Sequence, residues 1–162
     1  MIAPDGFDAW RNCFRVIQGR EIWSIYGAWM RDHNPALGPG IKERMAFAAA
    51  VTADQAEAAR KAMGQARAQI RSIIPPGSIA ALPSAPSIAP RLDSAADALD
   101  AFRMRGLALT CIAGLSGLPQ ISIPIGTVDG CPIGLSLIGW PGADEVLLDM
   151  AVELAPYCGV AY

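Results

Sequence analysis

The residues of this sequence that could carry acid-base or nucleophilic chemistry are its single histidine and its four cysteines. His33 stands between Asp32 and Asn34 at a predicted helix end, and no nucleophile motif accompanies it, which favours a structural role. Cys111 and Cys131 flank a predicted hairpin, but neither follows an activating motif, and free cysteines are commonly buried and unreactive. We therefore expect no catalytic residue, with a cysteine hydrolase built on Cys111 as the alternative.

The spacing of these residues also disfavours a metal or nucleotide site. The sequence has no Cys-x-x-Cys pair and no His-Glu-x-x-His string, so it offers no zinc-ligand pattern. Gly114 and Gly117 follow a predicted helix rather than a strand, and they match no phosphate-binding loop. We predict a tight helix-to-strand turn at these glycines, reduced cysteines, no metal and no cofactor.

The composition indicates one domain with more apolar surface than usual. The 162 residues are 52% hydrophobic and 17% charged, whereas charged residues make up about 25% of an average soluble domain. The longest apolar stretches, 107–118, 121–125 and 133–140, are shorter than the roughly 20 residues that cross a bilayer. The excess is therefore expected in a buried sheet and in a surface that meets another piece of protein, not in a membrane.

The net charge of the chain and its first six residues limit which partners and which cellular compartment we expect. The formal net charge is −2 and the basic residues are scattered, so we expect no nucleic-acid partner. The segment 1–6 has no basic region followed by an apolar one, which predicts a cytoplasmic protein.

Helical patterns dominate the first half of the chain. Apolar residues from Trp10 to Trp29 recur at helical spacing and predict one helix, or two helices separated at Gly19. The proline and glycine residues of 34–40 predict a loop, and a short helix is expected over 41–50. Thr52 and Gln55 form a capping-box pattern that opens a helix to about Ser72. Its predicted buried stripe consists of Ala56, Ala59, Met63, Ala66 and Ile70.

Strands and two further helices are predicted in the second half. A short buried strand is expected over 78–82, and Ser94 with Asp97 predicts the start of a helix whose polar first half leads into apolar residues. The segments 120–125 and 132–137, joined through Asp129 and Gly130, predict an antiparallel hairpin. Pro124 implies an edge strand or a bulge there. A last amphipathic helix is expected after Gly142.

Strand periodicity assigns the hairpin side chains to two faces. One face is predicted to carry Ile121, Ile123 and Ile125, matched on the partner strand by Ile133, Leu135 and Leu137. The opposite face is predicted to carry Gln120, Ser122 and Ser136.

The stretch from Leu109 to Gly126, LTCIAGLSGLPQISIPIG, and the stretch from Cys131 to Gly139, CPIGLSLIG, resemble the C-terminal part of amidase-signature enzymes. The family pattern there is a Gly-Leu-Pro, an Ile-Ser-x-Pro strand and a Pro-x-Gly-x-x-Leu return strand. The segments 82–86 and 145–154 resemble further family elements in the same order. Within the family, the sequence of the stretch from Leu109 to Gly126 is most similar to that of indole-3-acetamide hydrolases. The resemblance implies an α/β fold, with helices packed on part of a mixed sheet that includes an antiparallel hairpin near 119–139, and residues 1–162 as a single partial domain.

What the resemblance implies about function depends on residues that this sequence does not match. Family members hydrolyse carboxamides with a serine nucleophile, a second serine in a cis peptide and a lysine base, and the serines lie in an upstream Gly/Ser-rich segment. No such string occurs here, and Lys42 and Lys61 are not in a matching setting. No catalytic residue is carried over, and Thr110, Cys111 and Leu118 are the candidates for the wall of the substrate pocket.

Two hypotheses from different classes follow. In the first, the chain is the C-terminal part of an amide hydrolase, inactive by itself, which meets its small-molecule amide only together with an upstream amidase half. In the second, it is a noncatalytic binding or oligomerisation module that keeps the fold and uses an uncovered sheet edge to hold another chain, including a second copy of itself.

Overall fold

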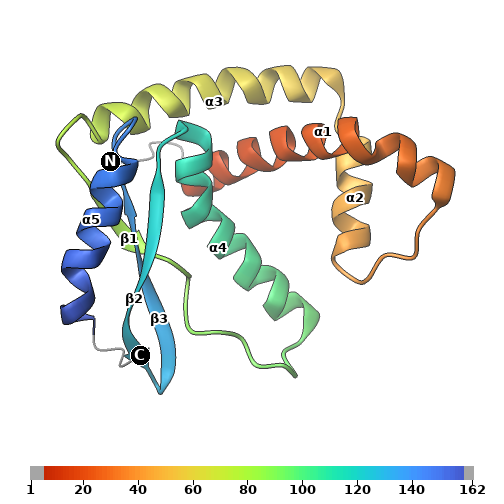
Figure 1. The fold of residues 1–162 in the computed structure, drawn as a ribbon. Helices are drawn as coiled ribbons and strands as arrows, with labels where there is room; N and C mark the ends of the chain where they lie inside the picture. Colours follow the sequence, from red (N-terminus) through yellow and green to blue (C-terminus); the bar gives the residue numbers. More distant parts are fainter. Residues whose placement is uncertain (1–5, 159–162) are drawn as a thin grey trace.

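The computed structural model describes residues 6–158 as a layer of helices packed on one face of a three-stranded sheet, with another helix on the opposite face (Figure 1). The helical layer contains α1 (Phe7–His33), α2 (Ile41–Ala50), α3 (Ala53–Ile73) and α4 (Ala96–Ser116). The sheet contains β1 (Ala80–Pro83), β2 (Gln120–Val128) and β3 (Cys131–Ile138), and α5 (Asp144–Leu154) covers its other face before the short 3-10 helix η1 (Ala155–Tyr157). The predicted α/β class is confirmed.

Helix α1 is continuous, so of the two sequence interpretations the single helix is correct. Gly19 does not interrupt it because that position is buried where α2 approaches: an added Cβ would lie 3.2 Å from the ring of Phe47 and 3.4 Å from the backbone of Ala48. The helix ends where Asn34 takes a left-handed conformation and donates its N–H to Met30 O. The absent side chain at Gly19 therefore lets α2 pack across α1.

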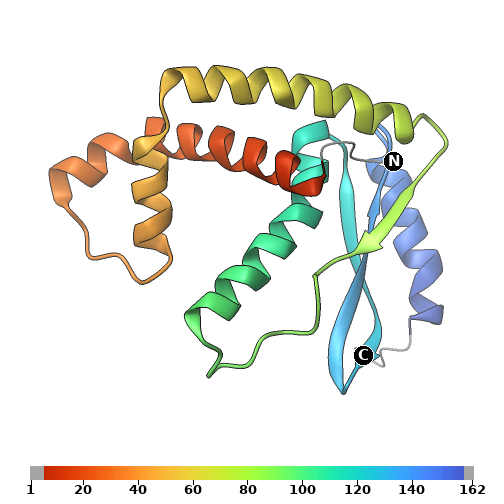
Figure 2. The ribbon, with the colours of Figure 1, turned by 180° about the vertical axis from the view of Figure 1, so that it is seen from behind.

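Helix α3 follows its prediction closely. Thr52 Oγ1 accepts from the Gln55 N–H at 3.2 Å and Gln55 Oε1 accepts from the Thr52 N–H at 3.0 Å, which completes the expected capping box. The small side chains of its stripe are buried and Met63 is half-buried against the core. Small residues on this face allow α3 to lie along α1, as the two views in Figures 1 and 2 show.

The predicted cap of α4 is wrong. The helix begins one residue later, after Ala95, and no side chain caps it. Ser94 instead donates its N–H to Arg91 O, and the Asp97 carboxylate accepts from the neighbouring Ala98 N–H at 2.8 Å. The Ser94 N–H that a capping box would pair with the Asp97 carboxylate is thus bonded to Arg91 O, and the carboxylate bonds to Ala98, so the reciprocal bond of a capping box does not form.

The C-terminal end of α4 is buried and held by α3. The helix extends to Ser116, so the predicted turn begins only at Gly117, whose left-handed φ of 63° lets its N–H and that of Leu118 bond to Ala113 O. Arg67 Nε donates to Leu115 O at 3.1 Å and Arg71 Nε donates to Ser116 O at 2.8 Å. These two guanidinium groups satisfy helix carbonyls and lie at the negative end of the helix dipole.

The sheet has the strand order β1-β3-β2, and both pairs are antiparallel. Asp129 and Gly130 both have positive φ, 51° and 74°, as a two-residue hairpin turn requires. The bulge expected near Pro124 is present between Pro124 and Gly126, on an edge strand. It shifts the register, so Ile133 pairs with Gly126 and the predicted match with Ile125 is wrong.

Strand β1 also differs from its prediction. It lies at the other edge of the sheet, and its side chains alternate between half-buried and exposed rather than being buried throughout.

Each face of the sheet packs on its own cluster. Toward α5, the buried Ile123 and Leu137 contact Leu147, and half-buried residues of the same helix, Met150, Ala151 and Leu154, pack around them. Toward the helical layer, Ile138 joins the larger core of Trp10, Ala66, Ile70, Ile74, Cys111, Leu115 and Leu118. On this second face Ser136 Oγ lies 2.8 Å from Ser122 Oγ and 2.9 Å from Ser84 Oγ, so the hydroxyl row satisfies the buried Ser136.

Truncating the centre of the larger core should strongly destabilise the chain. Leu115 is fully buried, so Leu115→Ala removes apolar contacts and leaves a cavity, which we expect to lower the free energy of unfolding by about 2–5 kcal/mol. Urea unfolding followed by circular dichroism measures this change. Leu148→Ala, at a site 58% exposed on α5, is the matched control and should cost less than about 0.5 kcal/mol. Equal losses in the two variants would contradict this description of the core.

Removing a guanidinium from the end of α4 should have a smaller effect. Arg71→Gln leaves the Ser116 carbonyl without this donor, and we expect a loss of about 1–2 kcal/mol in the same unfolding experiment. Arg60→Gln on the same helix breaks only the exposed ion pair with Glu57 and should change the stability by less than about 1 kcal/mol. A variant at position 71 as stable as the original chain would show that the bond to Ser116 is dispensable.

Candidate functional site

A cavity of about 870 Å³ opens between α1, α2 and the first part of α4. Its volume lies within the range of about 300–1,000 Å³ typical of small-molecule sites. Apolar side chains that include Ile22, Phe47, Leu99, Phe102 and Leu107 form much of its wall. The charged residues on the wall are Arg15, Arg44, Arg103, Glu43 and Asp100. The cavity thus combines an apolar body with a small number of charged groups.

The loop before α2 sets one side of this cavity. Gly40 has a φ of 77° and directly precedes the helix. The Gly40 N–H donates a hydrogen bond to the Glu43 carboxylate. The backbone N–H groups of Glu43 and Gly40 hold the pKa of the Glu43 carboxyl below its usual range. One turn into the helix, Arg44 Nε donates to Gly40 O at 2.8 Å, which orients its guanidinium group. Hydrogen bonds to Gly40 therefore fix both of these charged residues at the start of α2.

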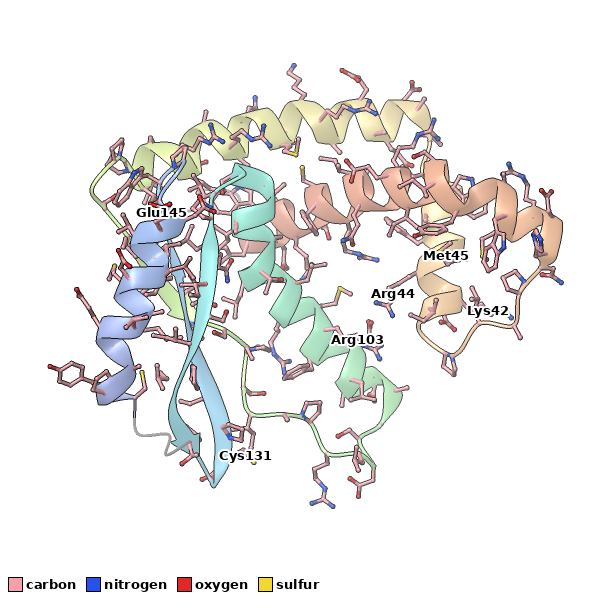
Figure 3. All side chains as sticks on the ribbon, viewed as in Figure 1. Lys42, Arg44, Met45, Arg103, Cys131 and Glu145 are labelled. Atoms are coloured by element: carbon pink, nitrogen blue, oxygen red, sulfur yellow. The ribbon has the colours of Figure 1, made fainter. Side chains whose placement is uncertain are left out.

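Guanidinium groups from three helices surround the opening. Figure 3 shows the side chains of Arg44 and Arg103 pointing toward one another, from α2 and from α4. A Cβ added at Gly40 would lie 3.1 Å from Arg103 Nη1, so the glycine gives this guanidinium room. Arg15 lies over the ring of Phe47, 4.7 Å from its centroid. Within residues 6–158, none of these three arginines forms an ion pair with a carboxylate.

The three residues predicted from the sequence to form a pocket wall do not share one surface. Two of them lie on α4 but point to different sides of it. Thr110 lines the cavity, and its hydroxyl donates to Gly106 O at 3.2 Å. Cys111, the next residue on α4, points the other way and has no exposed surface. Leu118 is only 6% exposed and packs in the same core as Cys111. The structure thus places Thr110 on a ligand-accessible surface and the other two inside the protein.

The remaining candidate groups lie outside the cavity. Burial raises the pKa of Cys111 to about 11 and also raises that of Cys13, so both thiols are protonated at neutral pH. Cys131 begins β3 at the tip of the hairpin (Figure 3). The His33 ring bonds through Nδ1 to Trp29 O at 3.1 Å and stacks on the Trp29 ring. Among the described residues, no group of three potential ligands could hold a metal ion.

Sequence reasoning did not identify the arginines of the cavity. Arg15, Arg44 and Arg103 lie far apart in the chain and share no motif, and only the helix packing brings them together. The one local signal was Gly40 followed by Arg44 a single turn later, a spacing that places the guanidinium near the glycine carbonyl.

Comparisons with known proteins agree with the geometry of the fold. Residues 7–148 match the family model described as Amidase. The chain is 30% identical over 146 residues to Amidase 1 of Arabidopsis thaliana, covering 90% of this chain and 34% of that protein. It is 28% identical to the chloroplastic outer envelope protein 64 of the same plant, covering 90% of this chain and 25% of that protein. No helix within residues 6–158 is both long and apolar enough to cross a membrane.

A solved structure shows the same fold. The crystal structure described as that of an amidase superposes with a TM-score of 0.75 at 22% identity, over 87% of this chain and 33% of the other. The chain therefore spans about a third of the length of Amidase 1 and of the chain in this solved structure. The family model covers most of its residues, and on that ground the chain belongs to the amidase family.

Proposed function

We propose that this chain is the C-terminal part of an enzyme that hydrolyses a carboxamide to a carboxylate and ammonia, and that it is inactive by itself. The single observation that carries the proposal is the match to the amidase family over residues 7–148. The resemblance of residues 109–139 to the family's C-terminal pattern supports the position within the longer enzyme. The relative named Amidase 1 supports the general reaction.

The chemistry of the described residues supports inactivity of the chain alone. Amide hydrolysis by a serine needs an adjacent base and hydrogen-bond donors placed for the developing oxyanion. The hydroxyls of Ser84, Ser122 and Ser136 bond to one another, and Ser116 Oγ donates to Ile112 O at 2.7 Å. Within residues 6–158, no serine hydroxyl is hydrogen-bonded to a lysine or histidine side chain. The catalytic serines and lysine are therefore proposed to come from another part of the enzyme.

The contribution of this chain is then one wall of the substrate pocket. Thr110 and the first half of α4 face the cavity, opposite the loop that ends at Gly40. Cys111 and Leu118 support that wall from the core behind it. The carboxamide group of the substrate is proposed to be positioned for hydrolysis only when the catalytic part completes the other side.

The second candidate, a noncatalytic module that binds another chain, is favoured by the uncovered surfaces. Strands β1 and β2 are both edges of the sheet, and edge strands pair readily with a further strand. Apolar side chains are also exposed on α1 and α5, among them Ile25 at 69% and Val152 at 75%. An upstream amidase half or a second copy of the chain is the partner expected. A neighbouring gene that encodes a Gly/Ser-rich segment would favour the enzyme over the module.

Location is part of the proposal. We propose the cytoplasm as the location of this chain. The relative named as an outer envelope protein makes an organelle surface the location to compare in cells.

The purified chain should release no ammonia from indole-3-acetamide or from simple aryl and aliphatic amides, because no serine within residues 6–158 is hydrogen-bonded to a lysine or histidine side chain that could act as its base. Ammonia is measured at high protein concentration, with a purified full-length amidase as the positive control and buffer as the blank. Ammonia release well above the blank would contradict the proposal of an inactive part and would direct the search to a nucleophile in this chain.

Cys111 should react with iodoacetamide at least about tenfold more slowly than Cys131 in the native chain. Its pKa of about 11 leaves on the order of one thiol in a thousand ionised at pH 8, and its sulfur is not exposed. Mass spectrometry of the alkylated peptides measures both rates, and the same reaction in denaturant is the control in which the rates should converge. Equal native rates would restore Cys111 as a candidate nucleophile.

A further inference from the structure

The charges of the cavity between α1, α2 and α4 indicate what it binds. Its wall carries three guanidinium groups and two carboxylates, and none of these arginines forms an ion pair within residues 6–158. We propose that this cavity binds the carboxylate of an organic molecule with an aromatic or aliphatic body. The inference rests on the proposed function, because it takes the cavity as part of the substrate pocket: the substrate is then an amide that also bears a carboxylate.

Arg44 is held ready for such a group. Its Nε donates to Gly40 O at 2.8 Å, so the backbone fixes the plane of the guanidinium while its two Nη groups have no partner among the described residues. A carboxylate has two oxygens that accept from such a pair of N–H groups, and fixing the donor in advance reduces the entropy lost on binding.

Arg103 lies across the opening and completes the positive side. It points toward Arg44 in Figure 3, and its Nη1 would be 3.1 Å from a Cβ at Gly40. No hydrogen bond or ion pair occupies it in the described part of the chain. Two guanidinium groups that approach each other repel unless an anion lies between them, and a carboxylate between Arg44 and Arg103 would remove that repulsion.

The negative groups do not cancel this charge. The Glu43 carboxylate already accepts the Gly40 N–H, and it lies at the N-terminal end of α2, where the helix dipole favours it. Asp100 lies on α4 one turn before Arg103, without an ion pair to it. A surplus of positive charge therefore remains on the cavity wall.

The surroundings favour an organic carboxylate over inorganic phosphate. Phosphate sites at helix ends use free backbone N–H groups, and the N–H of Gly40 is taken by Glu43. The rest of the wall is largely apolar, with Ile22 and Phe102 among its side chains, and it suits a hydrocarbon or aromatic body.

The test compares the binding of hippurate and of its neutral amide, hippuramide, to the purified chain by isothermal titration calorimetry. The two probes have the same aromatic body and nearly the same size, but only hippurate has a carboxylate. We expect hippurate to bind on the order of tenfold or more tightly than hippuramide. Raising the sodium chloride concentration from about 0.05 M to about 0.5 M should weaken the binding of hippurate and leave the binding of hippuramide unchanged.

Variants identify the groups responsible. Arg103→Gln should reduce the preference for hippurate to less than about threefold, because one of the two guanidinium groups is lost. Arg103 makes no hydrogen bond within residues 6–158, so this variant should keep the fold, which circular dichroism checks. Arg105→Gln, on the same helix but not on the cavity wall, is the matched control and should bind like the original chain.

Three results would overturn the proposal: equal binding of the two probes, no binding of either, or an unchanged preference in Arg103→Gln. The binding test does not depend on turnover. If the chain binds hippurate but the complete enzyme does not hydrolyse amides, the proposed reaction is refuted and the carboxylate site stands. If the complete enzyme hydrolyses amides but the chain shows no preference for hippurate, the site alone is refuted.

Discussion

The burial of the C-terminal end of α4 is the constraint on which the rest of the structure depends. Four carbonyl groups at a helix end lack partners within the helix, and here that end lies inside the protein. Arg67 and Arg71 reach from α3 to Leu115 O and Ser116 O, and the left-handed Gly117 turns the chain directly into β2. Without these donors, the apolar contacts of Leu115 would be gained at the cost of unsatisfied backbone groups.

The same anchoring decides where the cavity lies. Because the last turns of α4 are fixed against α1, α3 and the sheet, its first turns diverge from the sheet toward α2 (Figures 1 and 2). Apolar residues late in the helix pack the core, whereas the earlier residues Asp100 and Arg103 face the opening. One helix thus serves both as the centre of the core and as a wall of the candidate site.

This division of roles is consistent with a chain that supplies binding surface rather than reactive groups. The buried thiols are held protonated, His33 is held by Trp29, and the hydroxyls on the sheet bond to one another. Three arginines of the cavity wall, Arg15, Arg44 and Arg103, form no ion pair within residues 6–158, and a guanidinium group cannot act as a base at neutral pH but can bind anions. The chain spans 34% of the length of Amidase 1 of Arabidopsis thaliana, and the proposed reaction assigns the nucleophile to the part of the enzyme that lies outside this chain.

The sequence by itself determined the local elements and the family. Neighbouring residues dictate the backbone conformation at several places, and the sequence predicted these correctly. They are the helix cap at Thr52, the loop over 34–40 and the hairpin turn at Asp129 and Gly130. The sequence did not determine the start of α4, where the Ser94 N–H bonds to Arg91 O, or the register beyond Pro124, which the bulge shifts. It also did not determine the exposure of β1, which follows from the place of this strand at the edge of the sheet.

The tertiary structure alone decided the site. Thr110 and Cys111 are adjacent in sequence, yet the rotation of about 100° per helical residue places one in the cavity and the other in the core. Arg15, Arg44 and Arg103 become neighbours only through the packing of three helices, so no spacing in the sequence could reveal their common surface.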